Sequence, residues 1–255
     1  MPRWARAVGQ PGVLAALLDQ DRRVIRWDQR GCGRSAGADG PFSLSQSLAD
    51  LDAIRRHLGI GRWIVGGHSW GASLALRAVL SNPAVAAGLL YLSGTGLGRT
   101  WHAAYKAALA ERSTPAQLAR CEVLDSMANR TRDEEIEWRT LRWAPDFADR
   151  SRAIELASID ASAPWAVNLA CNAAINAECK TWDFDAIRTQ CESLDIPALL
   201  VHGAQDPRAP YAIDHLATAL PDAEVTVIDR AGHVPWLERP GAVAAALRAW
   251  LSATS

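Results

Sequence analysis

Hydrophobic positions in the first part of the chain follow two different periods. Apolar residues recur every three or four positions over residues 44–58, which predicts an amphipathic helix that Ser43 caps and Gly59 ends. Short continuous apolar runs predict strands at residues 23–27, 62–66 and 89–93. Strands that alternate with helices predict right-handed crossovers and a parallel sheet. The predicted fold class is therefore α/β, a mostly parallel sheet with flanking helices.

The pattern changes over residues 98–190, where strand-like runs disappear and prolines divide the segment into several short helices. Strand-like runs return at residues 196–203 and 225–228, and a final helix is predicted over residues 241–251. We therefore predict an α/β core formed by residues 1–97 and 191–255. Residues 98–190 form a helical cap over the active site.

Two sets of side chains allow more than one interpretation. The cap segment carries five tryptophans, which either shape an apolar pocket or only hold the cap together: Trp101, Trp138, Trp143, Trp165 and Trp182. His202 lies inside an apolar run, and we interpret it as a hydrogen-bonded core histidine rather than a base.

Composition narrows the class of partners. The chain has 255 residues, 49% of them hydrophobic and 22% charged, and a formal net charge of −1, which gives no reason to expect nucleic acid or an anionic membrane as partner. The five scattered cysteines fit free thiols and a cytoplasmic location better than a disulfide framework. No H-E-x-x-H or C-x-x-C motif is present, so we expect no metal site. The sequence does not indicate an oligomeric state.

The run Gly-Gly-His-Ser-Trp-Gly at residues 66–71 carries the most specific chemical signal. It fits the pattern G-x-S-x-G between an apolar strand and the helix-like segment 74–80, the context of a nucleophilic serine. Gly67 and Gly71 suit a tight turn, and Ser69 is expected to lie exposed at its tip. The alternative is a glycine- and serine-rich loop without chemistry.

A nucleophilic serine needs a base, and the base needs an orienting carboxylate. Asp206 follows the predicted strand 196–203 and His233 follows the strand 225–228, so both lie where open parallel sheets carry their sites. Each has an ordinary alternative, a turn residue before proline for Asp206 and a surface-loop histidine for His233. The order Ser69, Asp206, His233, each after a strand, favours a catalytic triad.

Three stretches resemble the proline iminopeptidase (prolyl aminopeptidase) family of the α/β-hydrolases. Residues 27–35, Trp-Asp-Gln-Arg-Gly-Cys-Gly-Arg-Ser, are similar to a loop of that family, and residues 66–71 resemble its nucleophile turn with a tryptophan after the serine. Residues 202–206 and 232–233 match its acid and base blocks. The resemblance runs from about residue 22 to the C-terminus. It implies an α/β-hydrolase fold with a helical cap inserted between strands 6 and 7.

The resemblance also implies a serine hydrolase that releases an N-terminal residue, typically proline, from a short peptide or amide. Ser69 would attack the carbonyl, His233 would transfer the proton and Asp206 would orient the imidazole. The backbone N–H of Trp70 would donate to the oxyanion. The substrate's free amine calls for a carboxylate, and Glu178 is the candidate, with a solvated helix glutamate as the alternative. No cofactor is implied.

One departure from the family concerns the start of the chain. The family has about three further strands before this segment, and the third ends in an H-G loop that supplies a second oxyanion N–H. Because we recognise neither here, we expect an N-terminally shortened chain, with these strands and the H-G loop missing and with poor folding or low activity. Three classes stay open: a serine aminopeptidase, another small-molecule hydrolase such as an esterase or C–C bond hydrolase, and an inactive truncated remnant.

Overall fold

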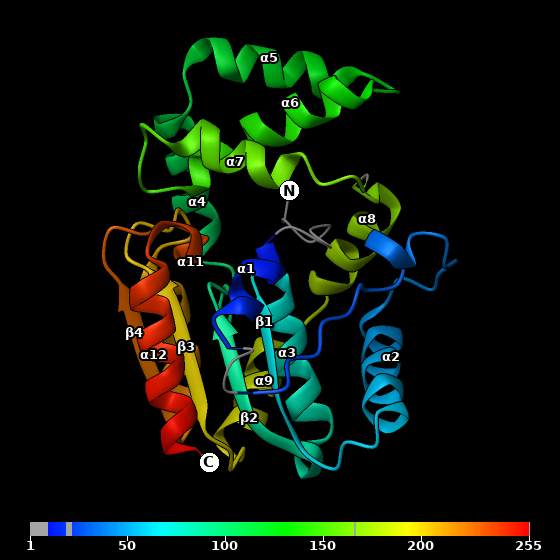
Figure 1. The fold of residues 1–255 in the computed structure, drawn as a ribbon, viewed down its shortest axis with the longest axis vertical. Helices are drawn as coiled ribbons and strands as arrows, with labels where there is room; N and C mark the ends of the chain where they lie inside the picture. The colour runs from blue at the N-terminus through cyan, green and yellow to red at the C-terminus, as the bar shows by residue number, and fades with distance from the viewer. Residues whose placement is uncertain (1–9, 19–21, 166, 255) are drawn as a thin grey trace.

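A four-stranded, fully parallel sheet forms the centre of the molecule (Figure 1). The computed structural model describes residues 10–18, 22–165 and 167–254. The strands lie side by side in chain order: β1 (Trp63–His68), β2 (Ala86–Leu92), β3 (Ala198–Gly203) and β4 (Ala223–Ile228). All four strands predicted from residue 62 onward are thereby confirmed.

The first predicted strand, residues 23–27, is wrong. Residues 23–29 have no regular secondary structure. β1 pairs with β2 on one side, and within the described residues no strand pairs with its other edge. An apolar run becomes a strand only where a neighbouring strand completes its ladder of hydrogen bonds, and none of the described strands pairs with residues 23–29.

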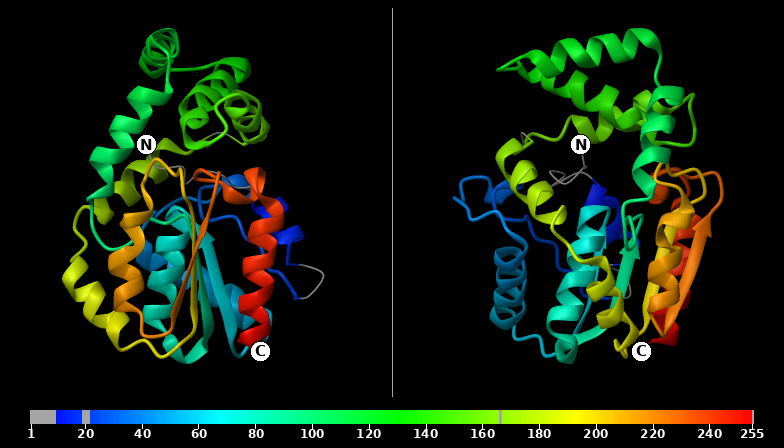
Figure 2. Two further views of the ribbon diagram at one scale, coloured as in Figure 1. Left: turned by 90° about the vertical axis from the view of Figure 1, so that its left-hand side faces the viewer. Right: turned by 180° about the vertical axis from the view of Figure 1, so that it is seen from behind.

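Helices cover both faces of the sheet, because successive side chains of the buried strands point in opposite directions (Figure 2). Leu89 and Leu200 pack toward α3 (Trp70–Ser81), α9 (Phe184–Glu192) and α10 (Asp214–Ala219). Leu90 and Leu199 pack on the opposite face, toward α11 (Pro235–Glu238) and α12 (Pro240–Ala253). The predicted apolar face of the last helix is buried as expected, at Val243, Leu247, Trp250 and Leu251.

Shorter elements complete the core. α2 (Leu44–His57) confirms the predicted helix: the Ser43 hydroxyl accepts a hydrogen bond from the Gln46 N–H (3.2 Å), and Gly59 has a φ of +65°. The other short elements are α1 (Gln10–Ala16) and the 3-10 turns η1 (Gly33–Ser35), η2 (Pro83–Val85), η3 (Ala144–Asp146) and η4 (Pro210–Ile213).

The chain between β2 and β3 consists of helices joined by loops, with no strand in its described part. Its helices are α4 (Trp101–Arg112), α5 (Pro115–Ser126), α6 (Arg132–Trp143), α7 (Ala153–Ala161), α8 (Leu169–Cys179) and α9. α5, α6 and α7 stand beyond the carboxyl ends of the strands, whereas α9 returns and packs its Ile187 and Cys191 into the core (Figure 1). No described helix is both long and apolar enough to cross a membrane.

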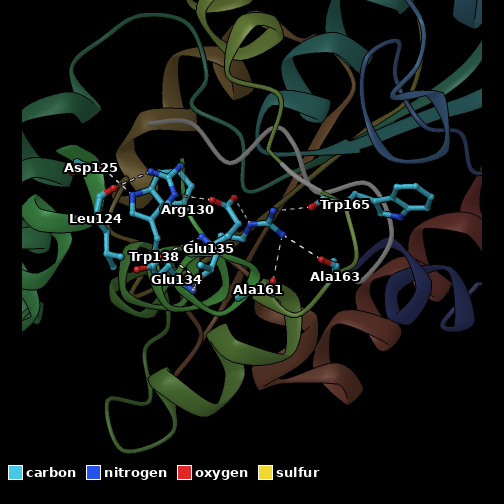
Figure 3. Close-up of polar contacts among 11 residues, drawn as sticks. Leu124, Asp125, Arg130, Glu134, Glu135, Trp138, Ala161, Ala163 and Trp165 are labelled. Carbon is cyan, nitrogen blue, oxygen red and sulfur yellow. Dashed lines mark hydrogen bonds and ion pairs between the residues drawn. The ribbon is translucent and has the colours of Figure 1, made fainter. Parts of the chain in front are cut away.

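Polar contacts between α6 and the segment after α7 tie the outer helices together, from Glu135 to the carbonyls of Ala161 and Trp165 (Figure 3). Arg139 of α6 is 2% exposed, and its Nε donates to Oε1 of Glu135 (2.9 Å), whose Oε2 accepts from Arg130 (2.8 Å). The terminal nitrogens of Arg139 donate to three backbone carbonyls at the end of α7 and beyond, those of Ala161, Ala163 and Trp165 (3.3, 3.3 and 2.7 Å). These bonds fix the segment after α7 to α6.

We expect Arg139→Met to lower the free energy of unfolding by about 2–3 kcal/mol, because three carbonyls lose a buried donor while Glu135 keeps Arg130. Urea unfolding followed by circular dichroism measures the change. The matched control is Arg120→Met, whose ion pair with Glu137 is exposed, and which should leave the midpoint almost unchanged. Equal stability of both variants would contradict the role of Arg139.

Candidate active site

Ser69 lies in the sharp turn between the end of β1 and the start of α3. Its φ and ψ are 57° and −118°, a region that costs free energy for any residue with a Cβ, and its N–H donates to the carbonyl of Leu92 (2.9 Å). Strain of this kind gathers at functional sites. The side chain is only 8% exposed, so the expectation of an exposed serine is wrong. Helices α5, α6 and α7 lie beyond this edge of the sheet (Figure 1).

The two glycines of the motif have different roles. A Cβ built on Gly67 would lie 1.9 Å from the carbonyl oxygen of Gly71, so the turn closes only with glycine at position 67. A Cβ built on Gly71 would meet nothing within 4 Å. Gly71 therefore contributes its backbone carbonyl to the tight turn, and there is room at this position for a side chain.

Asp206 and His233 form a buried acid–base pair. The two residues are 4% and 0% exposed, and Oδ2 of Asp206 lies 2.6 Å from Nδ1 of His233. Asp206 stands in the loop after β3, and His233 stands in the loop after β4. An ionised carboxylate can only accept, so we assign the proton to Nδ1, which makes Nε2 the nitrogen able to take a proton.

His68 connects the serine turn to this pair. It precedes Ser69 directly, its Nε2 lies 2.8 Å from the backbone oxygen of His233, and the two rings are 4.6 Å apart. The ring of Trp236 also packs against His68, with the two ring centroids 4.7 Å apart in a T-shaped arrangement. The structure thus brings Asp206 and His233 together directly and places the neighbour of Ser69 against His233.

Segments from the cap and α11 hold the histidine loop. The N–H of His233 donates to the backbone oxygen of Asp146 in η3 (2.8 Å), and a Cβ on Gly232 would come within 2.1 Å of that same oxygen. The carboxylate of Glu238 accepts from the Gly232 N–H (2.6 Å) and from two N–H groups that follow η3, at Ala148 and Asp149 (2.8 and 3.0 Å). Burial raises the pKa of Glu238, and these three donors oppose that rise.

Arg208 and Asp146 are site residues that sequence analysis missed. The guanidinium of Arg208 is 3% exposed and lies 2.8 Å from Oδ1 of Asp146 and 3.5 Å from Oδ1 of Asp206. Burial disfavours the charged guanidinium, yet the nearby carboxylates raise the pKa of Arg208. Arg208 lies two residues after Asp206, and this position in the sequence could have suggested a role in the site. Asp146 lies 62 positions before Arg208, and no sequence motif marks it.

His202 is a buried histidine beside the acid. It is 0% exposed, and neither ring nitrogen has a hydrogen-bond partner among the described residues; Nε2 lies 3.5 Å from Oδ2 of Asp206. The interpretation as a core histidine is right about burial and wrong about hydrogen bonding. Burial lowers its pKa, which keeps the ring neutral.

The two remaining predicted site residues lie on different elements. Trp70 is the first residue of α3, where backbone N–H groups point out of the helix, and its indole donates to Oε1 of Gln29 (3.2 Å). Glu178 of α8 accepts a hydrogen bond from the N–H of Leu44 (2.8 Å), so it caps the start of α2. Its role in binding a substrate amine stays a prediction. Within the described residues no cluster of three acidic, histidine or cysteine side chains could hold a metal ion.

Comparison with known proteins identifies the family. The profile of the Alpha/beta hydrolase family matches residues 3–246. The chain belongs to this family. The proline iminopeptidase of Neisseria gonorrhoeae is 28% identical over 243 residues, which cover 83% of this chain and 74% of the relative. A protein of Streptomyces coelicolor named "Probable proline iminopeptidase" is 38% identical over 95 residues, 34% of this chain and 29% of the relative.

Solved structures of the family share the fold. A thermophilic esterase from Thermogutta terrifontis superposes with a TM-score of 0.69 and 22% identity, over 97% of this chain and 87% of the esterase. A variant of the meta-cleavage product hydrolase from Pseudomonas fluorescens IP01 gives a TM-score of 0.67 and 17% identity, over 96% and 85% of the two chains. The α/β-hydrolase fold predicted from the sequence is confirmed.

The two motif glycines should respond differently to the same substitution. We expect Gly67→Ala to destabilise the fold by about 3 kcal/mol and to abolish labelling of Ser69 by a fluorophosphonate, because its Cβ overlaps a backbone carbonyl. Gly71→Ala should be neutral or stabilising by less than about 1 kcal/mol, since it adds a better helix former in open space. Thermal melts and gel-based labelling measure both effects. A stable, labelled Gly67→Ala protein would rule out the tight turn.

Proposed function

We propose that this α/β-hydrolase is a serine aminopeptidase of the proline iminopeptidase type. The observation that carries the proposal is the buried pair of Asp206 and His233, at 2.6 Å, joined through His68 to the strained turn that holds Ser69. These groups have the chemical types and the chain order that acyl transfer by a serine nucleophile requires.

Each residue has a distinct role in the proposed reaction. Ser69 Oγ attacks the carbonyl carbon of the N-terminal residue while Nε2 of His233 takes the hydroxyl proton. Asp206 holds the imidazole by Nδ1 and stabilises the imidazolium that forms. The N–H of Trp70 donates to the developing oxyanion. His233 then returns the proton to the leaving amine, and water releases the acyl group by the reverse steps.

Peptidase activity is favoured over ester or C–C bond hydrolysis by sequence rather than by fold. The relative aligned over 83% of this chain is a proline iminopeptidase, whereas the esterase and the meta-cleavage product hydrolase share only the architecture at 22% and 17% identity. The chemistry itself separates the classes, because an aminopeptidase must bind a free ammonium group and an esterase need not.

The test is hydrolysis of proline β-naphthylamide by the full chain, with N-acetylproline β-naphthylamide and p-nitrophenyl acetate beside it. We expect turnover of the free amine only, reduced roughly 10⁴-fold or more in Ser69→Ala because the nucleophile is lost. Ester hydrolysis without amidase activity would move the assignment to the esterases. A folded chain that turns over nothing and takes up no fluorophosphonate would be an inactive remnant.

Glu178→Gln separates the two roles available to that residue. Glutamine keeps an acceptor for the Leu44 N–H but removes the charge that a substrate ammonium would meet. If Glu178 binds the amine, KM for proline β-naphthylamide rises about 10-fold or more, with stability unchanged. An unchanged KM would leave Glu178 with its structural role alone. Asp183→Asn, which alters the exposed N-cap of α9, is the matched control.

A further inference from the structure

Asp146 contacts His233 of the buried acid–base pair directly and reaches Asp206 only through Arg208. The backbone oxygen of Asp146 accepts the N–H of His233 (2.8 Å), and its side-chain Oδ1 accepts from the guanidinium of Arg208 (2.8 Å). Arg208 in turn reaches Oδ1 of Asp206 with its guanidinium (3.5 Å) and, more closely, with its backbone N–H (2.9 Å). Asp146 comes from η3, between α6 and α7, so this contact joins the cap to the acid–base pair.

The two oxygens of the Asp206 carboxylate bind different partners. Oδ1 faces Arg208, and Oδ2 faces Nδ1 of His233. The side chain therefore cannot rotate freely without losing donors on both sides. Arg208 is itself held from a second direction by the ring of Tyr105 in α4, 4.4 Å from the guanidinium carbon.

The charges around His233 come from every element packed against it. The Asp206 carboxylate contacts the ring directly (2.6 Å), and Arg208 and then Asp146 follow it in a chain of ion pairs. The further titratable groups are His68 from β1, His202 from β3, Tyr105 from α4 and Glu238 from α11, with Asp214 of α10 acting on His202. In a site this buried, removing one charge is felt by its neighbours much more strongly than it would be at the surface.

We propose that Arg208 and Asp146 are positioning residues that set the proton affinity of His233, with Arg208 opposing the imidazolium and Asp146 restraining Arg208. The proposal rests on the proposed roles of Ser69, Asp206 and His233. The guanidinium lies closer to Asp146 than to Asp206, 2.8 Å against 3.5 Å, so its charge is shared between them. Asp206 thus keeps enough negative charge to support a protonated His233.

Substitutions at the two positions should therefore act in opposite directions. Arg208→Gln removes a positive charge, which favours the imidazolium, so more alkaline solution is needed to free the base. Asp146→Asn removes a negative charge and frees the guanidinium to pair with Asp206, which disfavours the imidazolium. The rate of Ser69 labelling should fall at acidic pH as His233 becomes protonated. We expect the midpoint of this fall to move up by about 0.5–1 pH unit in Arg208→Gln and down by a similar amount in Asp146→Asn.

The readout is the rate at which a fluorophosphonate labels Ser69 in the full chain, between about pH 5 and pH 9. In this reaction the serine oxygen bonds to phosphorus, fluoride leaves and the hydroxyl proton passes to His233, so the rate follows the fraction of neutral imidazole. The double variant Arg208→Gln/Asp146→Asn should return the midpoint toward the wild-type pH, since both charges are gone. Arg208→Lys should keep the midpoint within a few tenths of a unit but label more slowly, because an ammonium cannot fork between two carboxylates.

The matched controls are Arg152→Gln and Glu155→Gln, which break an exposed ion pair elsewhere in the cap and should shift nothing. Shifts in the same direction in both single variants, or no shift, would overturn the proposal. If the single variants do not fold, the lysine and double variants decide it, and a midpoint displaced in either of them would contradict it. Wild-type protein that takes up no label would count against the proposed function itself, so the two failures are distinguishable.

Discussion

The structure of the site depends on one constraint, the burial of the Asp206 carboxylate beside the buried ring of His233. A buried anion without partners is costly, and this carboxylate is 4% exposed. Its partners come from the loops after β3 and β4: the ring of His233 and the backbone and side chain of Arg208. Arg208 is buried as well, so it requires an anion of its own, and Asp146 in the cap supplies it. The need to compensate one charge thus extends from the sheet into the cap.

Close backbone approach is the second requirement, and it explains where glycine is needed. The turn of Ser69 closes because Gly67 leaves room for the carbonyl of Gly71, and the histidine loop rests on η3 because Gly232 leaves room for the carbonyl of Asp146. Each contact fixes the backbone beside one residue of the proposed triad. The strain at Ser69 and the fixed position of His233 are what the proposed mechanism would require of a preorganised site.

The apolar pattern along the chain was sufficient to predict most strands and helices. It was not sufficient to predict contacts between segments that are distant in the sequence. The strands from residue 62 onward, the helix 44–58 with its Ser43 cap, and the loops that carry Asp206 and His233 follow from apolar periodicity and turn residues. Residues 23–27 have the same apolar pattern but pair with none of the strands in the described part of the chain, and pattern alone does not show whether a neighbour exists. Asp146 had no distinguishing sequence context, since its importance arises only when η3 folds against the loop after β3. The burial of Ser69 and the missing hydrogen bonds of His202 likewise depend on what covers them.

The helices between β2 and β3 also support the acid–base pair. Arg139 fastens α6 to the segment after α7, and η3 lies between these two helices. Because η3 carries the oxygen that binds the His233 N–H and the carboxylate that binds Arg208, the position of the outer helices fixes the position of both contacts. A change in the packing of these helices would move Asp146, and it would therefore affect the acid–base pair through the bonds from Asp146 to His233 and to Arg208. On the proposed assignment, the helical segment that carries η3 would therefore influence the charge balance around His233.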